Sequence, residues 1–318
     1  MQNVGTPRFY VNILEYLGAI GYTEINNRYR TNPTSIKSSG QTITTSVPEG
    51  IFLEKSFVAY LGHAGGHLSQ DGGGAVTEIV NGAAGQSPNA ILPEYGGFSI
   101  VSFNGLNVGA EITTYNHNKI GSIVVGSYYD MPHSPDLNLK LSYDMDGVKT
   151  IQTKNGATLS NAMYTKPADW VNGRGAWQLG DNQNYRSGRR IWDLSFSYLA
   201  DTDVFPVNAS QSHLYNSADG YYEGANNPTT GFSDIAADGV SFVTNILDGQ
   251  DFFSSVWNKT MGNALPFIFQ PDGGGGVAGQ GNFNPDQFAI CKFVGDTLKY
   301  EQVAHNTYNI KLKIEEVW

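Results

Sequence analysis

The sequence is poor in charge and in cysteine, and each scarcity excludes classes of protein. Charged residues make up 15% of the 318 residues, against about 25% in an average soluble protein, whereas aromatic residues reach 12%. A disordered chain would show the opposite balance, because it is rich in charge and has few apolar side chains to bury. The single cysteine, Cys291, has no partner within the chain, so a disulfide-stapled secreted module is excluded.

Three further features are missing. The net charge is −10, so the basic excess of a nucleic-acid binder is absent and we expect no nucleic-acid partner. No run of about 18 apolar residues occurs, so we expect no membrane insertion. The first residues, MQNVGTPRFYVNILEYLGAIG, lack the basic stretch and following apolar stretch of a signal peptide. Synthesis in a cytoplasm is therefore expected.

What the sequence does contain is an alternation of apolar and polar residues, which places apolar side chains on one face of a β-strand. Three segments show it, at 137–145, 191–199 and 308–317. Each has one apolar and one polar face, which is typical of antiparallel sheets with a solvated side. In the second segment the expected inner face consists of Trp192, Leu194, Phe196 and Tyr198.

Turns, helices and loops complete the local prediction. Asp146-Gly147 follows the first alternating segment and predicts a two-residue hairpin, because this turn needs positive φ. Shorter apolar runs predict strands at Leu265–Phe269 and Phe288–Phe293, with Phe267 and Phe269 in the core. Helix signals occur at 251–262, where Asp251 would cap and Gly262 would end the helix, and at 12–20. Long loops cover 62–97, 206–240 and 272–286.

These patterns predict a mainly β fold: an antiparallel β-sandwich core with one or two short helices and long Gly-rich loops. We expect the β-sandwich domain over 119–318, with a loop insertion at 206–240. Residues 1–118 are expected to form an N-terminal arm and a β-rich region of uncertain fold. Loops of this length in a compact domain either have a function or become ordered against a partner.

Signals for catalysis are weak. His63 and His67 have the spacing of a helical zinc pair, but the glycines between them favour a loop and no third ligand is evident, so we expect no metal. Cys291 lies in an apolar strand and is expected to be a small buried side chain. A glycoside hydrolase needs two carboxyls about 5–9 Å apart, and chance occurrence explains the candidates equally well. We therefore expect no enzyme, no catalytic residue and no cofactor. The carboxylates considered are Asp130, Asp136, Glu223 and Asp234.

Arginines cluster at the head of the strand at 191–199. Arg186, Arg189 and Arg190 stand there in an otherwise acidic chain. An Arg pair suits carboxylates on a neighbouring subunit, although an ordinary solvated strand entry is the alternative. We expect Arg189 and Arg190 to form intersubunit ion pairs. Trp318, the last residue given, would either dock on a neighbour or lie against its own sheet.

The C-terminal third also shows a recognisable order of motifs. An aromatic strand entered by an Arg pair, GRRIWDLSFSYLADTD, is followed by DFFSSVWNKTMG, LPFIFQPD, NPDQFAICKF and VAHNTYNIKLKIEEVW. Over about 190–318 this order resembles the tail-tip and baseplate proteins of tailed bacteriophages, in the broad group of distal tail and minor tail proteins. The resemblance implies a β-sandwich and a ring-forming virion component without catalysis. Residues 1–118 show no such resemblance.

The resemblance, the low charge and the glycine-rich loops together predict a structural subunit of a phage tail tip or baseplate. It would be assembled in the host cytoplasm into the virion, form a homo-oligomeric ring and connect the tail tube to host-recognition parts. Its partners would be copies of itself and other phage tail proteins. One alternative is a receptor-binding or lectin-like protein that binds a host surface glycan through an aromatic platform of Tyr215, Tyr221, Tyr222 and the region of Trp170 and Trp177. Another is a tail-tube or capsid decoration protein.

Overall fold

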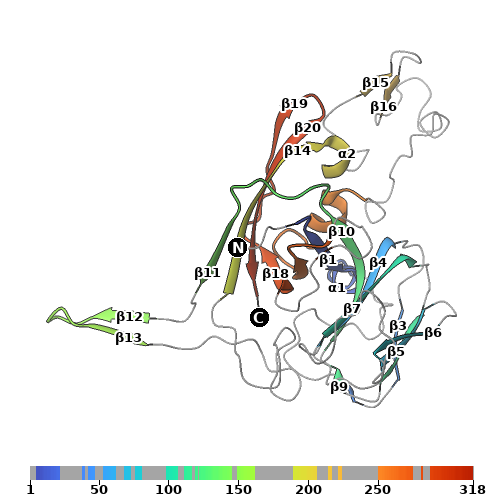
Figure 1. The fold of residues 1–318 in the computed structure, drawn as a ribbon, viewed down its shortest axis with the longest axis horizontal. Coiled ribbons are helices and arrows are strands. Elements are labelled where there is room, and N and C mark those ends of the chain that lie inside the picture. The colour runs from blue at the N-terminus through green and yellow to red at the C-terminus, as the bar shows by residue number, and fades with distance from the viewer. Residues whose placement is uncertain are drawn as a thin grey trace.

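The structure is a computed structural model that describes part of the chain (Figure 1). The described residues are 5–21, 38–39, 42–46, 53–61, 68–72, 76–80, 98–106, 111–116, 119–120, 122–144, 149–161, 189–205, 214–216, 221–223, 250–274, 281 and 287–317.

The described residues are mainly antiparallel β-strands with short helices, which confirms the expected fold class. The first half contains β1 (Arg8–Asn12), α1 (Ile13–Ala19), β2 (Ser38–Ser39), β3 (Thr42–Ser46), β4 (Leu53–Leu61), β5 (Leu68–Gly72), β6 (Val76–Val80), β7 (Phe98–Leu106), β8 (Glu111–Asn116), β9 (Lys119–Ile120), β10 (Ser122–Asp130), β11 (Lys140–Asp144), β12 (Lys149–Gln152) and β13 (Thr158–Asn161). The second half contains β14 (Arg189–Ala200), α2 (Asp201–Val204), β15 (Leu214–Asn216), β16 (Tyr221–Glu223), the π-helical turn η4 (Phe253–Trp257), β17 (Phe267–Gln270), β18 (Ala289–Phe293), β19 (Tyr300–Ala304) and β20 (Thr307–Glu316).

One large antiparallel sheet organises the molecule. Its strand order is β11-β14-β20-β18-β17-β1-β10-β4-β7, and β19 also pairs with β20, which makes ten strands. The sheet takes β1, β4 and β7 from the region 1–118 and the other strands from 119–318, so the two regions expected from the sequence share one sheet. A four-stranded sheet and three strand pairs accompany it. The β-sandwich stays a prediction.

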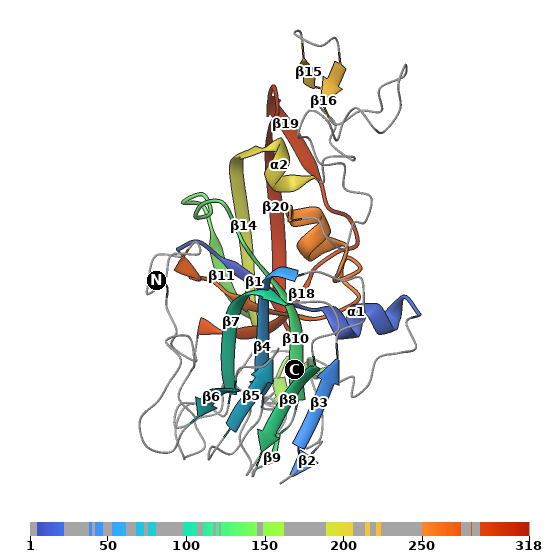
Figure 2. The same cartoon turned by 90° about the vertical axis from the view of Figure 1, so that its right-hand side faces the viewer.

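The middle of the large sheet is covered on both faces, and β1 is buried along its whole length. On one face Phe9 packs with Phe252 and Phe293, at ring distances of 5.7 and 6.2 Å. On the other face Tyr10 packs against Phe57 at 5.0 Å. Figure 2 shows α1 beside β10, on the flank of this middle region. Because β1 is buried on both faces, its apolar residues Phe9, Tyr10 and Val11 are consecutive, and the strand shows no alternation of apolar and polar residues.

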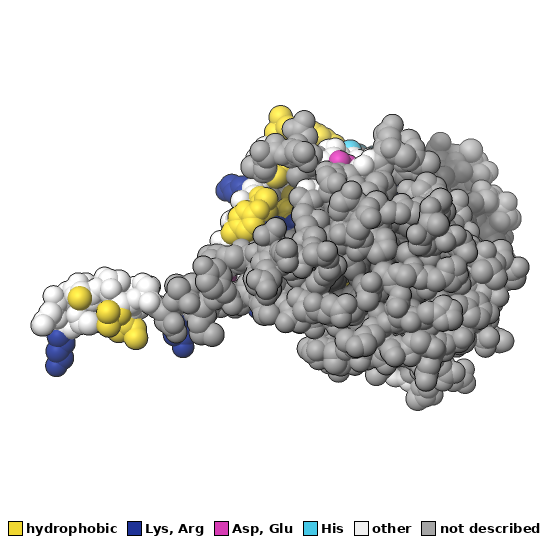
Figure 3. All heavy atoms as spheres, turned by 60° about the horizontal axis from the view of Figure 1, so that its bottom comes forward, with side chains coloured by type: hydrophobic (Ala, Val, Ile, Leu, Met, Phe, Trp, Pro, Cys, Tyr) yellow, Lys and Arg dark blue, Asp and Glu magenta, His cyan; other side chains and the backbone are white. Residues whose placement is uncertain are grey.

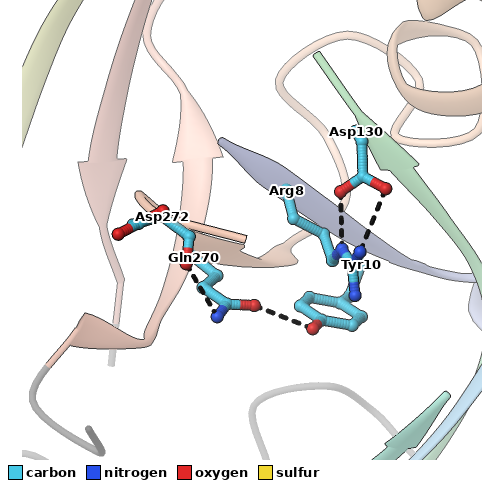
Figure 4. Close-up of polar contacts among 5 residues, drawn as sticks. All are labelled: Arg8, Tyr10, Asp130, Gln270 and Asp272. Carbon is cyan, nitrogen blue, oxygen red and sulfur yellow. Dashed lines mark hydrogen bonds and ion pairs between the residues drawn. The ribbon is translucent and has the colours of Figure 1, made fainter. Parts of the chain in front are cut away.

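A buried polar network ties β1 to its two neighbours (Figure 4). Arg8 binds Asp130 through two hydrogen bonds, Nε to Oδ1 at 2.6 Å and Nη2 to Oδ2 at 3.0 Å. The Tyr10 hydroxyl donates to Oε1 of Gln270 at 2.8 Å, and Gln270 Nε2 donates to the carbonyl of Asp272 at 3.0 Å. A bidentate Arg–carboxylate pair is geometrically specific. The network therefore fixes the register of β1 between β10 and β17.

Most sequence-predicted elements are present. The segment at 308–317 forms β20 with its apolar face buried, and Phe267 and Phe269 are buried in β17 as expected. The helix expected at 12–20 is α1. At 251–262, Asp251 Oδ1 caps the amide of Ser254 at 2.9 Å as expected, but the turn is π-helical, with Asn258 N donating to the carbonyl of Phe253. Gly262 follows with φ +66°.

The hairpin predicted at Asp146-Gly147 is wrong in its strand pairing. Residues 145–148 lie outside the described residues, but the strands on either side of them have other partners: β11 pairs with β14, and β12 pairs with β13. Pairing with β14 places Leu141 opposite Trp192 over the core. The burial of this apolar face outweighs the local turn preference, because a two-stranded hairpin alone is only marginally stable.

Candidate interaction surface

A projecting hairpin, here called the arm and comprising residues 149–161, is the most exposed described part of the chain. Strands β12 and β13 pair with each other and with no other described strand. Figure 1 shows them standing away from the large sheet, and Figure 3 shows hydrophobic and basic side chains on the arm's surface. An isolated hairpin in water has little stability of its own. The arm therefore has the form of an element that gains its packing from a partner.

The turn of the arm follows from its local sequence. The amide of Gly156 donates to the carbonyl of Thr153 at 2.9 Å, and the amide of Thr153 donates to the carbonyl of Ala157 at 2.8 Å. Gly156 has φ +82°, a conformation that glycine adopts without a steric penalty. Asn155-Gly156 is a turn signal of the same kind as Asp146-Gly147. This second signal was present in the sequence and was missed.

The most exposed large hydrophobic residues among the described ones lie on the arm, in β11 and the turn before it, and in β14. On the arm, Ile151 and Leu159 lie directly opposite each other and are 65% and 60% exposed. On the adjoining edge of the large sheet, Leu137, Tyr198 and Tyr143 are 102%, 78% and 63% exposed. Other described large hydrophobic residues that are exposed reach only 42–45%. Large hydrophobic side chains this exposed, on elements that follow one another in the chain, are candidates for an interaction surface.

The exposure of Leu137, Tyr143 and Tyr198 corrects the alternation expected from the sequence. The strand at 137–145 begins only at Lys140, so Leu137 lies in a turn outside the sheet, and Tyr143 lies in the edge strand β11. In β14 a β-bulge between Phe196 and Leu199 inserts one extra residue. Leu199 takes the inward position opposite Tyr308, and Tyr198 is displaced into solvent.

The bulge holds Tyr198 in an unusual backbone conformation. Its φ is +62°, a region that bulky residues rarely occupy. The Tyr198 amide donates to Asn309 Oδ1 at 3.1 Å, and Ser197 Oγ donates to Asp136 Oδ2 at 2.7 Å. The Asp136 amide in turn donates to the carbonyl of Ser195 at 2.8 Å. These bonds fix the turn that carries Leu137 beside the bulge that carries Tyr198. Residues Asp136, Leu137 and Tyr198 are here called the edge patch.

Arg190 corrects a second expectation, because its ion pair is formed within the chain. It is buried, and its Nε and Nη2 donate to Glu316 Oε2 and Oε1 at 2.9 and 3.0 Å. Nη2 also donates to the carbonyl of Phe288 at 2.8 Å, and the guanidinium lies 5.0 Å from the centre of the Trp192 ring. Burial alone would lower the pKa of Arg190, but the bonds to Glu316 raise it. The antiparallel register of β14 and β20 brings the two residues together.

The other candidate interface residues lie on different elements or outside the described residues. Arg189 is half-buried and lies opposite Asp144 in the register of β14 and β11. Tyr221 and Tyr222 lie in β16, which pairs with β15 at the end of the molecule far from the C-terminus (Figure 1). Trp318 lies outside the described residues. The proposed roles of these four residues stay predictions.

Some of the candidate catalytic groups are among the described residues and others are not. Cys291 is buried as expected, and burial raises its pKa well above its ordinary value. Asp130 is engaged by Arg8, and Asp136 accepts from Ser197. Within the described part of the chain, no three His, Cys, Asp or Glu side chains lie where they would hold a metal ion together. His63, His67, Asp234 and the side chain of Glu223 fall outside what is described.

Comparison of the chain with family models, with curated proteins and with solved structures finds no match. None of the helices among the described residues is long and apolar enough to cross a membrane.

Proposed function

We propose that the chain is a structural subunit of a phage tail tip or baseplate, which forms a homo-oligomeric ring and connects the tail tube to host-recognition parts. The observation that carries the proposal is the arm, an isolated hairpin whose opposed apolar residues Ile151 and Leu159 are both exposed. In a lone subunit these apolar side chains stay in water and contribute no stabilisation by burial. An assembled subunit can bury them against a neighbour. The order of motifs over 190–318 supports the assignment to a phage tail.

The composition is consistent with this role. Interface cores are poor in charge and rich in aromatic residues, and the chain has 15% charged and 12% aromatic residues. Its functional location would be the virion, and its partners would be copies of itself and other tail proteins. The proposal assigns the chain no catalysis, cofactor or metal.

The experiment has two parts. Native mass spectrometry and light scattering of purified full-length protein at micromolar concentration should show a discrete oligomer of several copies. Mass spectrometry of purified virions should find the chain, and antibody-labelled electron microscopy should place it at the tail tip. A protein that is monomeric at every concentration tested and absent from virions would refute the proposal. Label along the tube or on the capsid would favour the tail-tube or capsid decoration alternative, and monomers that bind host glycans would favour the receptor-binding one.

A further inference from the structure

We propose that the arm of one copy docks on the edge patch of a second copy. This inference rests on the proposed self-assembly and deepens it, because it names the two surfaces that meet. The donor surface is the hairpin that carries Ile151 and Leu159. The acceptor surface is the edge patch, with Asp136 and Leu137 just before β11 and Tyr198 at the bulge of β14.

The arm and the edge patch are both exposed in a single copy. Figures 1 and 3 show the arm standing clear of the described body, and its strands pair only with each other among the described strands. The arm is thus placed to reach away from its own chain. The edge patch is left exposed on the body, with Leu137 and Tyr198 among the most exposed large hydrophobic residues. A second copy would give each of these exposed apolar surfaces another apolar surface to pack against.

The arm and the edge patch carry opposite charges. The arm carries Lys149 and Lys154 and no acidic residue, although the chain as a whole has a net charge of −10. The edge patch carries the Asp136 carboxylate, which is next in sequence to Leu137 and accepts from Ser197, the neighbour of Tyr198. Among the described residues Asp136 has a hydroxyl donor, Ser197, but no ion-pair partner. An arm lysine of the second copy would supply the missing positive charge. Complementary charge of this kind mainly fixes orientation and speeds encounter.

The backbone around Tyr198 holds the edge patch in place. Tyr198 is displayed at a β-bulge with φ +62°, and its amide is fixed by Asn309. Positive φ in a bulky residue is uncommon, and such outliers are concentrated at functional sites. Tyrosine is also enriched among the residues that contribute most to binding. A side chain that is already positioned loses less conformational entropy on binding.

The contact has a consequence for symmetry. The arm and the edge patch are different surfaces, so the contact is head-to-tail rather than self-complementary. A head-to-tail contact repeats from copy to copy and produces a ring when the rotation closes. This is the type of contact that the proposed ring needs.

The test uses two full-length variants that each lose one surface. The arm variant carries Ile151→Ser and Leu159→Ser, and the patch variant carries Leu137→Ser and Tyr198→Asn. All four positions are exposed, so both variants should keep the wild-type circular dichroism spectrum. Each variant alone should be monomeric. A mixture should form a dimer with one copy of each in native mass spectrometry, because only one intact contact remains between them.

The matched control carries Ile20→Ser and Val294→Ser, two exposed hydrophobic residues that belong to neither surface, and should assemble like the wild type. A charge test adds a second readout. Asp136→Lys should weaken assembly by about fivefold, and Lys149→Glu with Lys154→Glu in the same chain should restore it. Restoration would not occur if Asp136→Lys acted by unfolding the protein.

The outcomes separate this inference from the proposed function. If the wild type assembles and either variant alone still assembles equally well, the docking is refuted while self-assembly stands. This result is expected if the arm binds a different tail protein. Assembly by the patch variant alone, with a monomeric arm variant, would indicate arm-to-arm pairing and also refute it. A monomeric wild type that is absent from virions would refute the proposed function, and the docking with it.

Discussion

Tyr198 and Asn309 face each other across β14 and β20, and the Tyr198 amide donates to Asn309 Oδ1 at 3.1 Å. This side-chain acceptor replaces a regular ladder bond at the bulge, where two residues of β14 oppose one residue of β20. This hydrogen bond stabilises Tyr198 at φ +62°, a backbone conformation that is otherwise unfavourable for a bulky residue.

Replacing Tyr198 by asparagine should stabilise the isolated subunit. Asparagine tolerates positive φ better than tyrosine, and an exposed tyrosine loses little burial when it is replaced. We expect a gain on the order of 1 kcal/mol in the free energy of unfolding, measured by urea titration. Asn309→Ala should have the opposite effect, a loss of about 1 kcal/mol, because it removes the acceptor. A destabilised Tyr198→Asn would contradict the strain assigned to this position.

Breaking the Arg190–Glu316 pair should be costly. Arg190→Met leaves the Glu316 carboxylate buried and uncompensated, so we expect a loss of about 3–5 kcal/mol in urea titration. Adding Glu316→Leu to the same chain should recover much of this loss, since a buried pair is replaceable by apolar side chains. Lys313→Met, at an exposed position on the same sheet, is the matched control and should cost less than about 1 kcal/mol. A small effect of Arg190→Met would mean that the pair is not buried in solution.

Gly126→Ala should disrupt the attachment of β1 to β10. A Cβ atom at Gly126 would overlap the carbonyl oxygen of Val11 and lie 2.9 Å from the amide nitrogen of Ile13. Both are backbone atoms, so relief requires movement of the strand, and we expect a loss above about 3 kcal/mol or failure to fold. Gly5→Ala is the control, because the three atoms nearest to its Cβ all belong to the side chain of Asp272, which can rotate away. Thermal unfolding of both variants measures the difference.

Alkaline pH should destabilise the fold. Burial raises the pKa of Tyr10 to about 12, whereas the phenol of an unfolded chain titrates near pH 10. The Tyr10 phenol therefore stays protonated to a higher pH in the native state than in the unfolded chain. Its contribution to stability is fully present below about pH 10 and is lost as the pH rises to about 12. Burial also raises the pKa of Tyr129 and Tyr300, which steepens the loss. In Tyr10→Phe the slope of stability against pH should be shallower, and an unchanged slope would contradict the assignment.

Local alternation predicted the regular strand β20 correctly and failed where a strand is interrupted. The alternation at 308–317 placed every apolar residue of β20 correctly, because that strand has one buried and one solvated face. The same reasoning failed at Leu137 and Tyr198, where a turn and a bulge interrupt the alternation. A bulge depends on how two strands distant in sequence are paired, so the sequence of 191–199 alone does not predict it.

The candidate interaction surface was only partly visible beforehand. The Asn155-Gly156 turn signal was available, but its importance depends on β11 pairing with β14 rather than with β12. Arg190 was correctly singled out as an ion-pair former, yet its partner lies 126 positions away in the same chain rather than on a neighbour. Charge alone does not reveal which carboxylate is closest.

The sequence alone determined the mainly antiparallel class, the inner face of β20, the cap at Asp251 and the burial of Phe267, because each depends on residues near one another in the chain. The tertiary structure decided that β1 lies at the centre of the sheet, that Arg190 binds Glu316, and that Ile151, Leu159 and Tyr198 point into solvent. These outcomes depend on long-range strand pairing, in which burial of a shared core selects one register among many that local preferences would allow.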